Sequence, residues 1–550
     1  MKESELDVYI KSLLPKTNGY PLYKPSPPGN SVAPQEFHKV AVRIGDVGVL
    51  TYDGGFDFLY NACVPATHPL NADRQPPDGF EPMTFDPSQI RQDCEAYPPR
   101  SFVTSDVSMA GSYVESYPGI LALLPERFSS FVRSLPWPFA QSAPDLDVAY
   151  NFRTNQYRDT VLILPEGAIR EDYADPELFL EYALKNAESW YHHANKTMGR
   201  LLINGDSLYF ITGRDKCKTW ALGAQDTIAG ASEWTANFVV APAAHSTASH
   251  QRVWETGNGR PSWMKIGPPV EQGTIDSQAV FIRGLRIARW DQGAESTTVR
   301  EDDEVTLICN HSPISPIYGP YHPSDYVNQF LLYNIPGAKK SFIHDDEWCE
   351  VLTKDAPLPQ DYEILIRILD SYAPVLESGC VHLIRRQSAS ESSLSQFDWD
   401  KPVRLERIGR FSMKRYPHTK QHTDLDAAVL LTRMAVELTP STHPEFKPRS
   451  SYAASCLKEA LGHPPPNSIA LQTLFERITF LIGETSKVEE EESVNRRQEA
   501  ESHIHSLVSH LRDVSRVMPS DRIKEFKSRR QLLGEELART ASGSIALLEI

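Results

Sequence analysis

The amino-acid sequence predicts an α+β protein: a β-rich body built on an antiparallel sheet or sandwich with packed helices, followed by an α-helical C-terminal region. Short runs of alternating apolar and polar residues recur between turn residues up to about residue 290. Beyond about residue 420, apolar residues recur at helical spacing instead. The 550 residues also exceed what one hydrophobic core usually supports, so we expect several folded units.

The N-terminal part is rich in proline. Residues 20–37 read YPLYKPSPPGNSVAPQEF, which predicts an extended surface segment, so residues 1–37 are assigned as a proline-rich arm. The β-rich body is expected over residues 38–410, with room for two subdomains. Its first hairpin is predicted in VGVLTYDGGFDFLYNA, because a glycine in the DGG turn supplies the positive φ that a tight turn needs.

Helices and strands alternate through the rest of the body. Residues 175–198 predict a helix with Asp175 as N-cap and Pro176 at the first helical position. A second hairpin is predicted in SLYFITGRDKCKTWALGA, with its turn at residues 213–216. HPSDYVNQFLLYNI predicts a helix with a Ser-led start, and DDEWCEVL begins another. QDYEILIRILDSYAPVL fits a helix and a strand equally, so both remain open.

The C-terminal region is expected to be helical. DLDAAVLLTRMAVELTP and FKPRSSYAASCLKEALGH predict two helices that end at Pro440 and Gly462. Residues 388–396 read as a linker, and residues 468–540 predict charged amphipathic helices. The apolar stripe of these helices comprises Ile504, Leu507, Val508, Leu511, Val514 and Met518.

Five motifs occur in order over residues 18–360, namely IGDVGVLTYDGGFDFLYN, LYFITGRDKCKTWALGA, QAVFIRGLRI, HPSDYVNQFLL and IHDDEWCEVL. Together they resemble an uncharacterised protein family of mushroom-forming (basidiomycete) fungi. The resemblance implies no known activity. Members often accompany modules of intracellular surveillance, which implies a role in recognition or signalling.

Residues 424–462 are similar to a single degenerate tetratricopeptide repeat, with an AVELTPSTHP run joining the two predicted helices. Small residues on both helices allow close approach, namely Ala427, Ala428, Ala435, Ala453 and Ala454. One repeat cannot bury both of its faces. The hairpin is therefore expected to dock on the body, on the following helix or on a partner.

The composition limits the partners that the protein can be expected to bind and the compartment in which it is expected. A net charge of −16 opposes binding to nucleic acid or an anionic membrane through the whole surface. The N-terminus lacks the apolar region of a signal peptide, and no run of about 18 apolar residues predicts a membrane span. The seven cysteines never form CxxC, as expected for reduced thiols in a cytoplasmic protein.

The common catalytic and nucleotide-binding motifs are absent from the sequence, and no cofactor or metal is expected. His344, Asp345, Asp346 and Glu347 place an imidazole beside three carboxylates, which could bind a divalent cation or act in acid–base catalysis. Adjacent side chains diverge, however, so Asp345 or Asp346 as an N-cap is the simpler interpretation. No catalytic residue is assigned, and His344, Asp345 and Asp346 remain the candidates if the chain is an enzyme.

Two further groups were weighed in the same way. His192 and His193 could bind a metal with Tyr191 or Asp172, but histidines near a helix C-terminus usually face solvent. Cys217 follows two cations that would favour its thiolate. A hairpin cysteine packed as a small apolar residue is the simpler interpretation.

We therefore expect a non-catalytic intracellular recognition or adaptor protein whose C-terminal helical region binds a protein partner or a second copy of itself. One alternative is a hydrolase or transferase of unrecognised fold that uses residues 344–346 in a cleft, where a second distant acid or histidine would converge. Another is a membrane-inserting effector. It needs lipid-facing alternation over about 9 to 11 residues, which only residues 205–225 approach.

Overall fold

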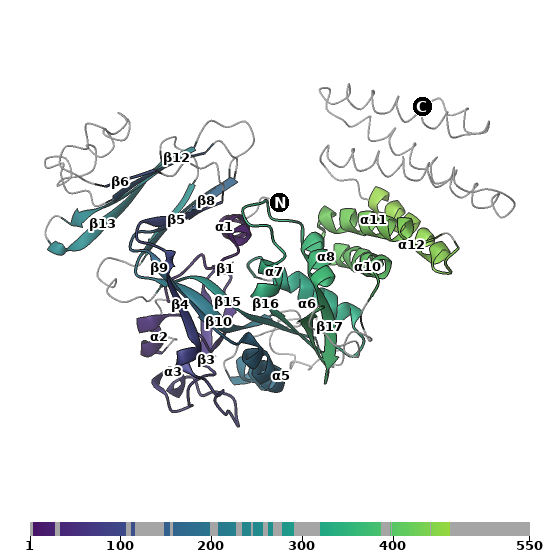
Figure 1. Cartoon of the computed structure of the whole chain (residues 1–550), viewed down its shortest axis with the longest axis horizontal. Helices are drawn as coiled ribbons and strands as arrows, with labels where there is room; N and C mark the ends of the chain where they lie inside the picture. The colour runs from purple at the N-terminus through teal and green to yellow at the C-terminus, as the bar shows by residue number, and fades with distance from the viewer. Residues whose placement is uncertain are drawn as a thin grey trace, which may run out of the picture. The chain divides into compact units, whose positions relative to one another are not determined.

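The computed structural model describes residues 4–27, 34–105, 112–115, 148–154, 158–197, 207–226, 234–243, 246–256, 262–267, 278–290, 319–386, 397, 399–440 and 442–462. The chain divides into two compact units between Asp398 and Trp399 (Figure 1). The helical unit therefore begins before residue 410, the predicted end of the body. The predicted linker, the helices at 468–540 and their apolar stripe lie outside the described residues.

The α+β class is confirmed. In the described part of the first unit, the strands form one ten-stranded sheet and two four-stranded sheets. Pairing is antiparallel except between β16 and β18, which run parallel. The ten-stranded sheet has the order β17-β18-β16-β15-β10-β2-β3, with β1 on β15, β9 on β10 and β4 on β9.

The strands of the ten-stranded sheet are β1 (Tyr20–Pro21), β2 (Asp46–Leu50), β3 (Phe56–Asn61), β4 (Ile90–Tyr97), β9 (Ala168–Tyr173), β10 (Ser207–Cys217), β15 (Gln278–Arg289), β16 (Lys340–His344), β17 (Tyr372–Glu377) and β18 (Cys380–Arg385). The second sheet contains β5 (Ser101–Thr104), β8 (Arg158–Leu164), β11 (Trp220–Asp226) and β14 (Ser262–Gly267). The third contains β6 (Ser112–Glu115), β7 (Val148–Thr154), β12 (Trp234–Ala243) and β13 (Ser246–Thr256).

The helices of the first unit are α1 (Glu5–Leu13), α2 (Gln35–Val40), α3 (Pro69–Ala72), α5 (Pro176–His192), α6 (Pro323–Asn334), α7 (Asp345–Cys349) and α8 (Asp361–Ser371). Short 3₁₀ turns are η1 (Leu14–Lys16) and η2 (Pro87–Gln89), and the π-helical turn η4 (His193–Thr197) follows α5. QDYEILIRILDSYAPVL therefore forms both structures that it fitted, a helix (α8) and then a strand (β17).

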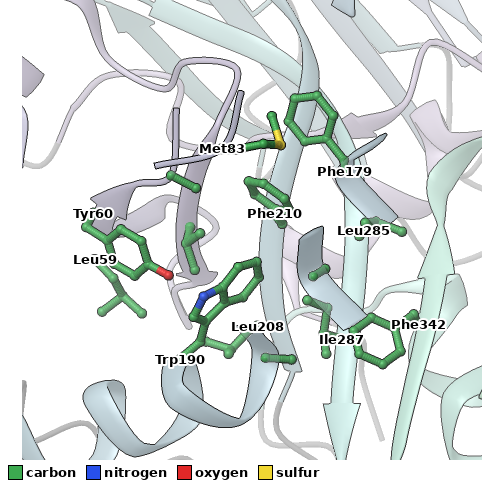
Figure 2. Close-up of a cluster of buried hydrophobic side chains, with 14 of the residues drawn as sticks. Leu59, Tyr60, Met83, Phe179, Trp190, Leu208, Phe210, Leu285, Ile287 and Phe342 are labelled. Carbon is green, nitrogen blue, oxygen red and sulfur yellow. The ribbon is translucent and has the colours of Figure 1, made fainter. Parts of the chain in front are cut away.

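Helix α5 and the central strands form the core in Figure 2. The predicted start is confirmed, because the Asp175 side chain accepts a hydrogen bond from the Glu177 amide. Phe179 and Trp190 pack against Phe210 of β10, with ring centroids 4.9 and 5.0 Å away. Each such aromatic or aliphatic side chain contributes roughly 1.5–3 kcal/mol on burial.

Alternation along β10 gives its two faces different roles. Leu208 and Phe210 point to α5, whereas Tyr209 between them hydrogen-bonds to Asp345 of α7. Helices α6 and α7 therefore cover the face of the central strands that α5 does not. A polar layer lies under α6 and α7, and it holds the candidate site.

The first predicted hairpin is confirmed, with β2 and β3 joined through Gly54 at φ +81°. The second is wrong. β10 continues through residues 213–216, pairing with β9 and β15, while β11 belongs to another sheet. Buried charges inside a strand resemble a turn in sequence, but here opposite charges on neighbouring strands satisfy them. β10 is buried on both faces along nearly its whole length.

The N-terminal segment is buried rather than laid over the surface. α1 is capped by Ser4, whose side chain accepts a hydrogen bond from the Asp7 amide. Tyr20 and Tyr23 are at most 2% exposed, and β1 pairs with β15. The expectation of a surface arm is therefore wrong for residues 20–23, because their apolar side chains fill the body despite the surrounding prolines.

The described part of the second unit contains α10 (Lys401–Thr419), α11 (His422–Glu437) and α12 (Phe446–Gly462). The helix pair α11–α12 docks on the preceding helix α10, an option that the sequence did not suggest. Gly409 permits this, since a Cβ there would lie 2.7 Å from Thr432 Cγ2. Glu406 of α10 also accepts hydrogen bonds from Arg410 and from Arg449 of α12.

Candidate functional site

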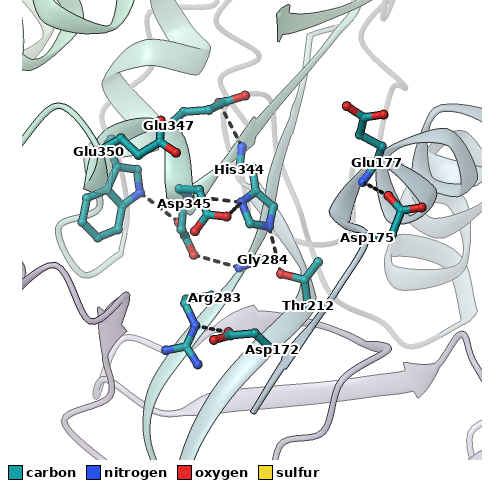
Figure 3. A network of polar contacts seen from close by, with 12 residues as sticks. Asp172, Asp175, Glu177, Thr212, Arg283, Gly284, His344, Asp345, Glu347 and Glu350 are labelled. Carbon is teal, nitrogen blue, oxygen red and sulfur yellow. Dashed lines mark hydrogen bonds and ion pairs between the residues drawn. The ribbon is translucent and has the colours of Figure 1, made fainter. Parts of the chain in front are cut away.

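The candidates His344, Asp345 and Asp346 lie at the junction of β16 and α7. Figure 3 shows His344 and Asp345. His344 is the N-cap of α7: its Nδ1 accepts a hydrogen bond from the Asp346 amide at 3.2 Å. The His344 amide in turn donates to Glu347 Oε2 at 3.1 Å, which completes a capping box. The expectation that Asp345 or Asp346 caps the helix is wrong, because the His344 imidazole accepts the hydrogen bond from the Asp346 amide instead of a carboxylate.

Asp345 is fully buried and joins the sheet to the helix. Its carboxylate accepts hydrogen bonds from the Gly284 amide and from Trp348 Nε1, both at 2.9 Å, and from the Tyr209 hydroxyl. Burial raises the pKa of Asp345 to about 6, although the hydrogen bond from Tyr209 opposes the shift. The neighbouring residues 344–346 thus take different roles, as their diverging directions predicted.

A second histidine meets Asp345 from α6. His322 Nε2 lies 3.4 Å from Asp345 Oδ1, while His322 Nδ1 accepts a hydrogen bond from the Ser324 amide at 3.1 Å. The ring also stacks on Tyr20, with centroids 4.6 Å apart. Burial lowers the pKa of His322 well below 6.5, so the ring is neutral with its proton on Nε2. The convergence of a distant histidine, which the enzyme hypothesis required, is therefore present, but both side chains are buried.

Thr212 is a site residue that the sequence did not reveal. Its Oγ1 lies 2.8 Å from His344 Nε2, and His344 Nδ1 lies 3.3 Å from Asp346 Oδ2. A bulge between Ile211 and Gly213 removes Thr212 from the pairing with β15, which turns its side chain toward His344. No local pattern links residues so far apart in the chain.

The order hydroxyl, imidazole, carboxylate is that of a hydrolase triad. The helix cap opposes this role. A nitrogen that accepts an amide hydrogen carries no proton, so the proton of neutral His344 is on Nε2 and points to Thr212. In this state, His344 cannot take a proton from the Thr212 hydroxyl.

Buried ion pairs surround the site on β10 and β15. Each of three arginines meets a carboxylate from another strand or helix. The pairs are Arg214 with Glu171 at 2.8 Å, Arg283 with Asp172 and with Asp215 at 2.8 Å, and Arg286 with Asp325 at 2.9 Å. Because the predicted turn placed Arg214 and Asp215 at the surface, this layer could not be predicted from the sequence.

The other candidate groups do not converge. His192 is exposed, whereas His193 is 2% exposed against the Tyr60 ring, so the expectation that both face solvent is wrong. Tyr191 donates to the Ile287 carbonyl at 2.6 Å, and Asp172 is paired. Cys217 is buried. Across the described ranges, no group of three or more His, Cys, Asp or Glu side chains is placed to hold a metal ion.

Comparison of the chain with protein-family models, curated proteins and solved structures finds no match. Within the part of the chain that the structure describes, no helix is both long and apolar enough to cross a membrane. Function is therefore inferred below from the geometry of the chain itself.

Proposed function

We propose that this protein is a non-catalytic recognition or adaptor protein whose helical unit binds a helical segment of a protein partner. The observation that carries the proposal is an apolar row on α11 that continues to its C-cap residue. Leu430 and Leu438 are 40% and 48% exposed, and Met434 between them is half-buried. Residues four apart form a ridge along a helix, and such ridges pack into the grooves of a second helix.

The surroundings of this row support a protein partner. The opposite side of α11 is occupied, since Ala428 and Thr432 pack against Gly409 of α10. Arg433 and Glu437 border the row and form an ion pair at 2.9 Å. An apolar strip beside charges of both signs suits an amphipathic helix better than a nucleic acid or an anionic membrane.

The first unit supports the same function. His344 and Asp345 are engaged in helix capping and buried hydrogen bonds, which suits a rigid scaffold. The resemblance to the fungal family, together with the composition, supports a cytoplasmic role in surveillance or signalling.

Site-specific photo-crosslinking tests the proposal. The photoreactive residue p-benzoylphenylalanine is placed at position 430 of the full-length chain in cells, and adducts are identified by mass spectrometry after irradiation. Position 423 is the matched control, because Thr423 is exposed on the same helix and lies outside the row. We expect an adduct with one other protein from position 430, and none from position 423.

Other adducts would contradict the proposal. Crosslinks confined to residues 463–550 of the same molecule would mean that the chain covers its own row. Crosslinks between isotopically distinct copies would mean self-association in place of an adaptor function. The absence of any adduct at position 430 would also contradict the proposal, because the apolar row would then bind no partner.

A hydrolase or transferase is the second candidate, favoured by the alignment of Thr212, His344 and Asp346. The tautomer of His344 separates the two functions. Nitrogen-15 NMR of the imidazole at alkaline pH, where the ring is neutral, is expected to show the proton on Nε2, as the helix cap requires. A proton on Nδ1, with an unprotonated Nε2 facing Thr212, would favour the enzyme.

A further inference from the structure

We propose that residues 344–348 form a proton-operated latch. In neutral His344, Nδ1 accepts the hydrogen bond from the Asp346 amide and caps α7. In protonated His344, the same Nδ1 donates a hydrogen bond to the Asp346 carboxylate. His344 Nδ1 lies 3.2 Å from the Asp346 amide nitrogen and 3.3 Å from Asp346 Oδ2. The first contact needs a lone pair on Nδ1, and the second needs a proton there. The two contacts therefore belong to two protonation states.

Thr212 keeps the ring in place during this exchange. Nε2 carries a proton in both states, so it donates to Thr212 Oγ1 in both, at 2.8 Å. Protonation of Nδ1 then changes the partner of this nitrogen from the Asp346 amide to the Asp346 carboxylate, and it leaves the ring orientation unchanged. The exchange needs no rearrangement of the sheet.

The charges around the imidazole favour the protonated state. Burial lowers the pKa of His344, but the carboxylates of Asp346 and Asp345, with Asp172 of β9, outweigh it and raise the pKa overall. The pKa of Asp346 is lowered: burial raises it, but the hydrogen bond and charge of His344, together with two nearby arginines, outweigh burial. Asp346 is therefore ionised when His344 takes up its proton.

Cations of the sheet act on the same carboxylate. Arg283 of β15 and Arg170 of β9 add to the lowering of the Asp346 pKa. On the α6 side, His322 faces Asp345 and stays neutral because burial lowers its pKa. Asp345 itself has a pKa of about 6, so it gains its proton at lower pH than His344, whose pKa is raised from 6.5.

The raised pKa values fix the direction of the pH effect. A group whose folded-state pKa is raised adds stability that is fully present below its unfolded pKa and is lost as pH rises through the folded pKa. His344 follows this rule from its unfolded value of 6.5 upward, and Asp345 between 3.8 and about 6. The latch therefore holds α7 and its buried Trp348 more tightly in mild acid than at alkaline pH.

His344→Asn in the full-length chain isolates the titration. Asparagine can still accept the Asp346 amide hydrogen at the N-cap, but it cannot take up a proton. Thermal unfolding is followed by circular dichroism at pH 5.5 and 8. The Tm of the wild type relative to the variant is expected to rise by about 2 °C or more on going to the lower pH.

His68→Asn is the matched control. His68 caps α3 through the Leu70 amide at 3.2 Å, and no carboxylate contact to its Nδ1 is recorded among the described residues. Because no carboxylate contact replaces the amide contact of His68, the Tm of the wild type relative to this variant should not rise at the lower pH. Equal behaviour of the two variants would overturn the proposal.

A second measurement tests the proposal even if His344→Asn folds poorly. Asp346→Asn keeps the amide donor and removes the carboxylate, and NMR of the His344 Cε1 proton follows the titration directly. The apparent pKa is expected above 6.5 in the wild type and lower in the variant. A wild-type pKa below 6.5, or no change in the variant, would show that Nδ1 serves the cap alone.

Discussion

At the scale of single residues, Arg283 binds three parts of the first unit together. Its guanidinium contacts Asp172 of β9, Asp215 of β10 at 2.8 Å and the Asn18 carbonyl at 2.6 Å, with a side chain only 3% exposed. Removing one partner of a buried ion pair leaves the other charge uncompensated. The ion pairs of Arg283 therefore matter chiefly because loss of the arginine would leave a buried carboxylate without its counter-charge, and less for the attraction itself.

Arg283→Met is expected to lower the free energy of unfolding by about 3–5 kcal/mol, because Asp215 would remain buried without its cation. Urea unfolding at neutral pH measures the change. Arg289→Met is the control on the same strand, since its ion pair with Glu188 is partly exposed and is worth about 0–1 kcal/mol. Similar losses in both variants would mean that burial gives Arg283 no special role.

At the scale of elements, the helical unit depends on the close crossing of α10 and α11. Thr432 donates to the Ala428 carbonyl at 2.7 Å, so its γ-methyl group is fixed against Gly409. Glycine inside a helix costs about 1 kcal/mol relative to alanine. This position therefore gives up local stability to allow close contact between two helices.

Gly409→Ala separates these two effects. Helix propensity alone would raise the Tm of the helical unit, whereas the 2.7 Å approach to Thr432 Cγ2 predicts a loss of about 1–2 kcal/mol. Chemical denaturation followed by circular dichroism gives the sign. In a Thr432→Ala background the same change should become neutral or stabilising, and a stabilising effect in the wild-type background would refute the close approach.

The elements that the sequence predicted well are those whose signals are local. Asp175 with Pro176 marks the start of α5, and the DGG turn marks the first hairpin. Residues 213–216 were misassigned because charges within a buried strand look like a turn until Glu171 is known to lie opposite Arg214. The contact of Thr212 with His344 could not be predicted, since only the sheet brings the two together.

At the scale of the whole first unit, the N-terminal segment contacts several distant parts of the chain. Lys16 pairs with Asp355 at 2.6 Å, and the Leu22 amide donates to the Val280 carbonyl at 2.9 Å. Tyr20 stacks on His322. A segment that the sequence predicted as a surface arm therefore contributes to the core.

Deletion of residues 1–27 is expected to remove the fixed packing of the first unit, with loss of its near-ultraviolet circular dichroism and rapid proteolysis. A surface arm would predict no such effect. Lys24→Ser is the control, because Lys24 is exposed and pairs with Asp53 at the surface. Native-like dispersion in the NMR spectrum of the shortened chain would contradict the buried role.

The pairing of β1 with β15 bears on how the protein is synthesised. Tyr20 lies opposite Ile282, so β1 leaves the ribosome before a partner strand that is made more than two hundred residues later. Contacts this distant in sequence form slowly, and unpaired strand edges favour aggregation during translation. Nascent chains of this protein are therefore expected to need chaperone protection until β15 has emerged.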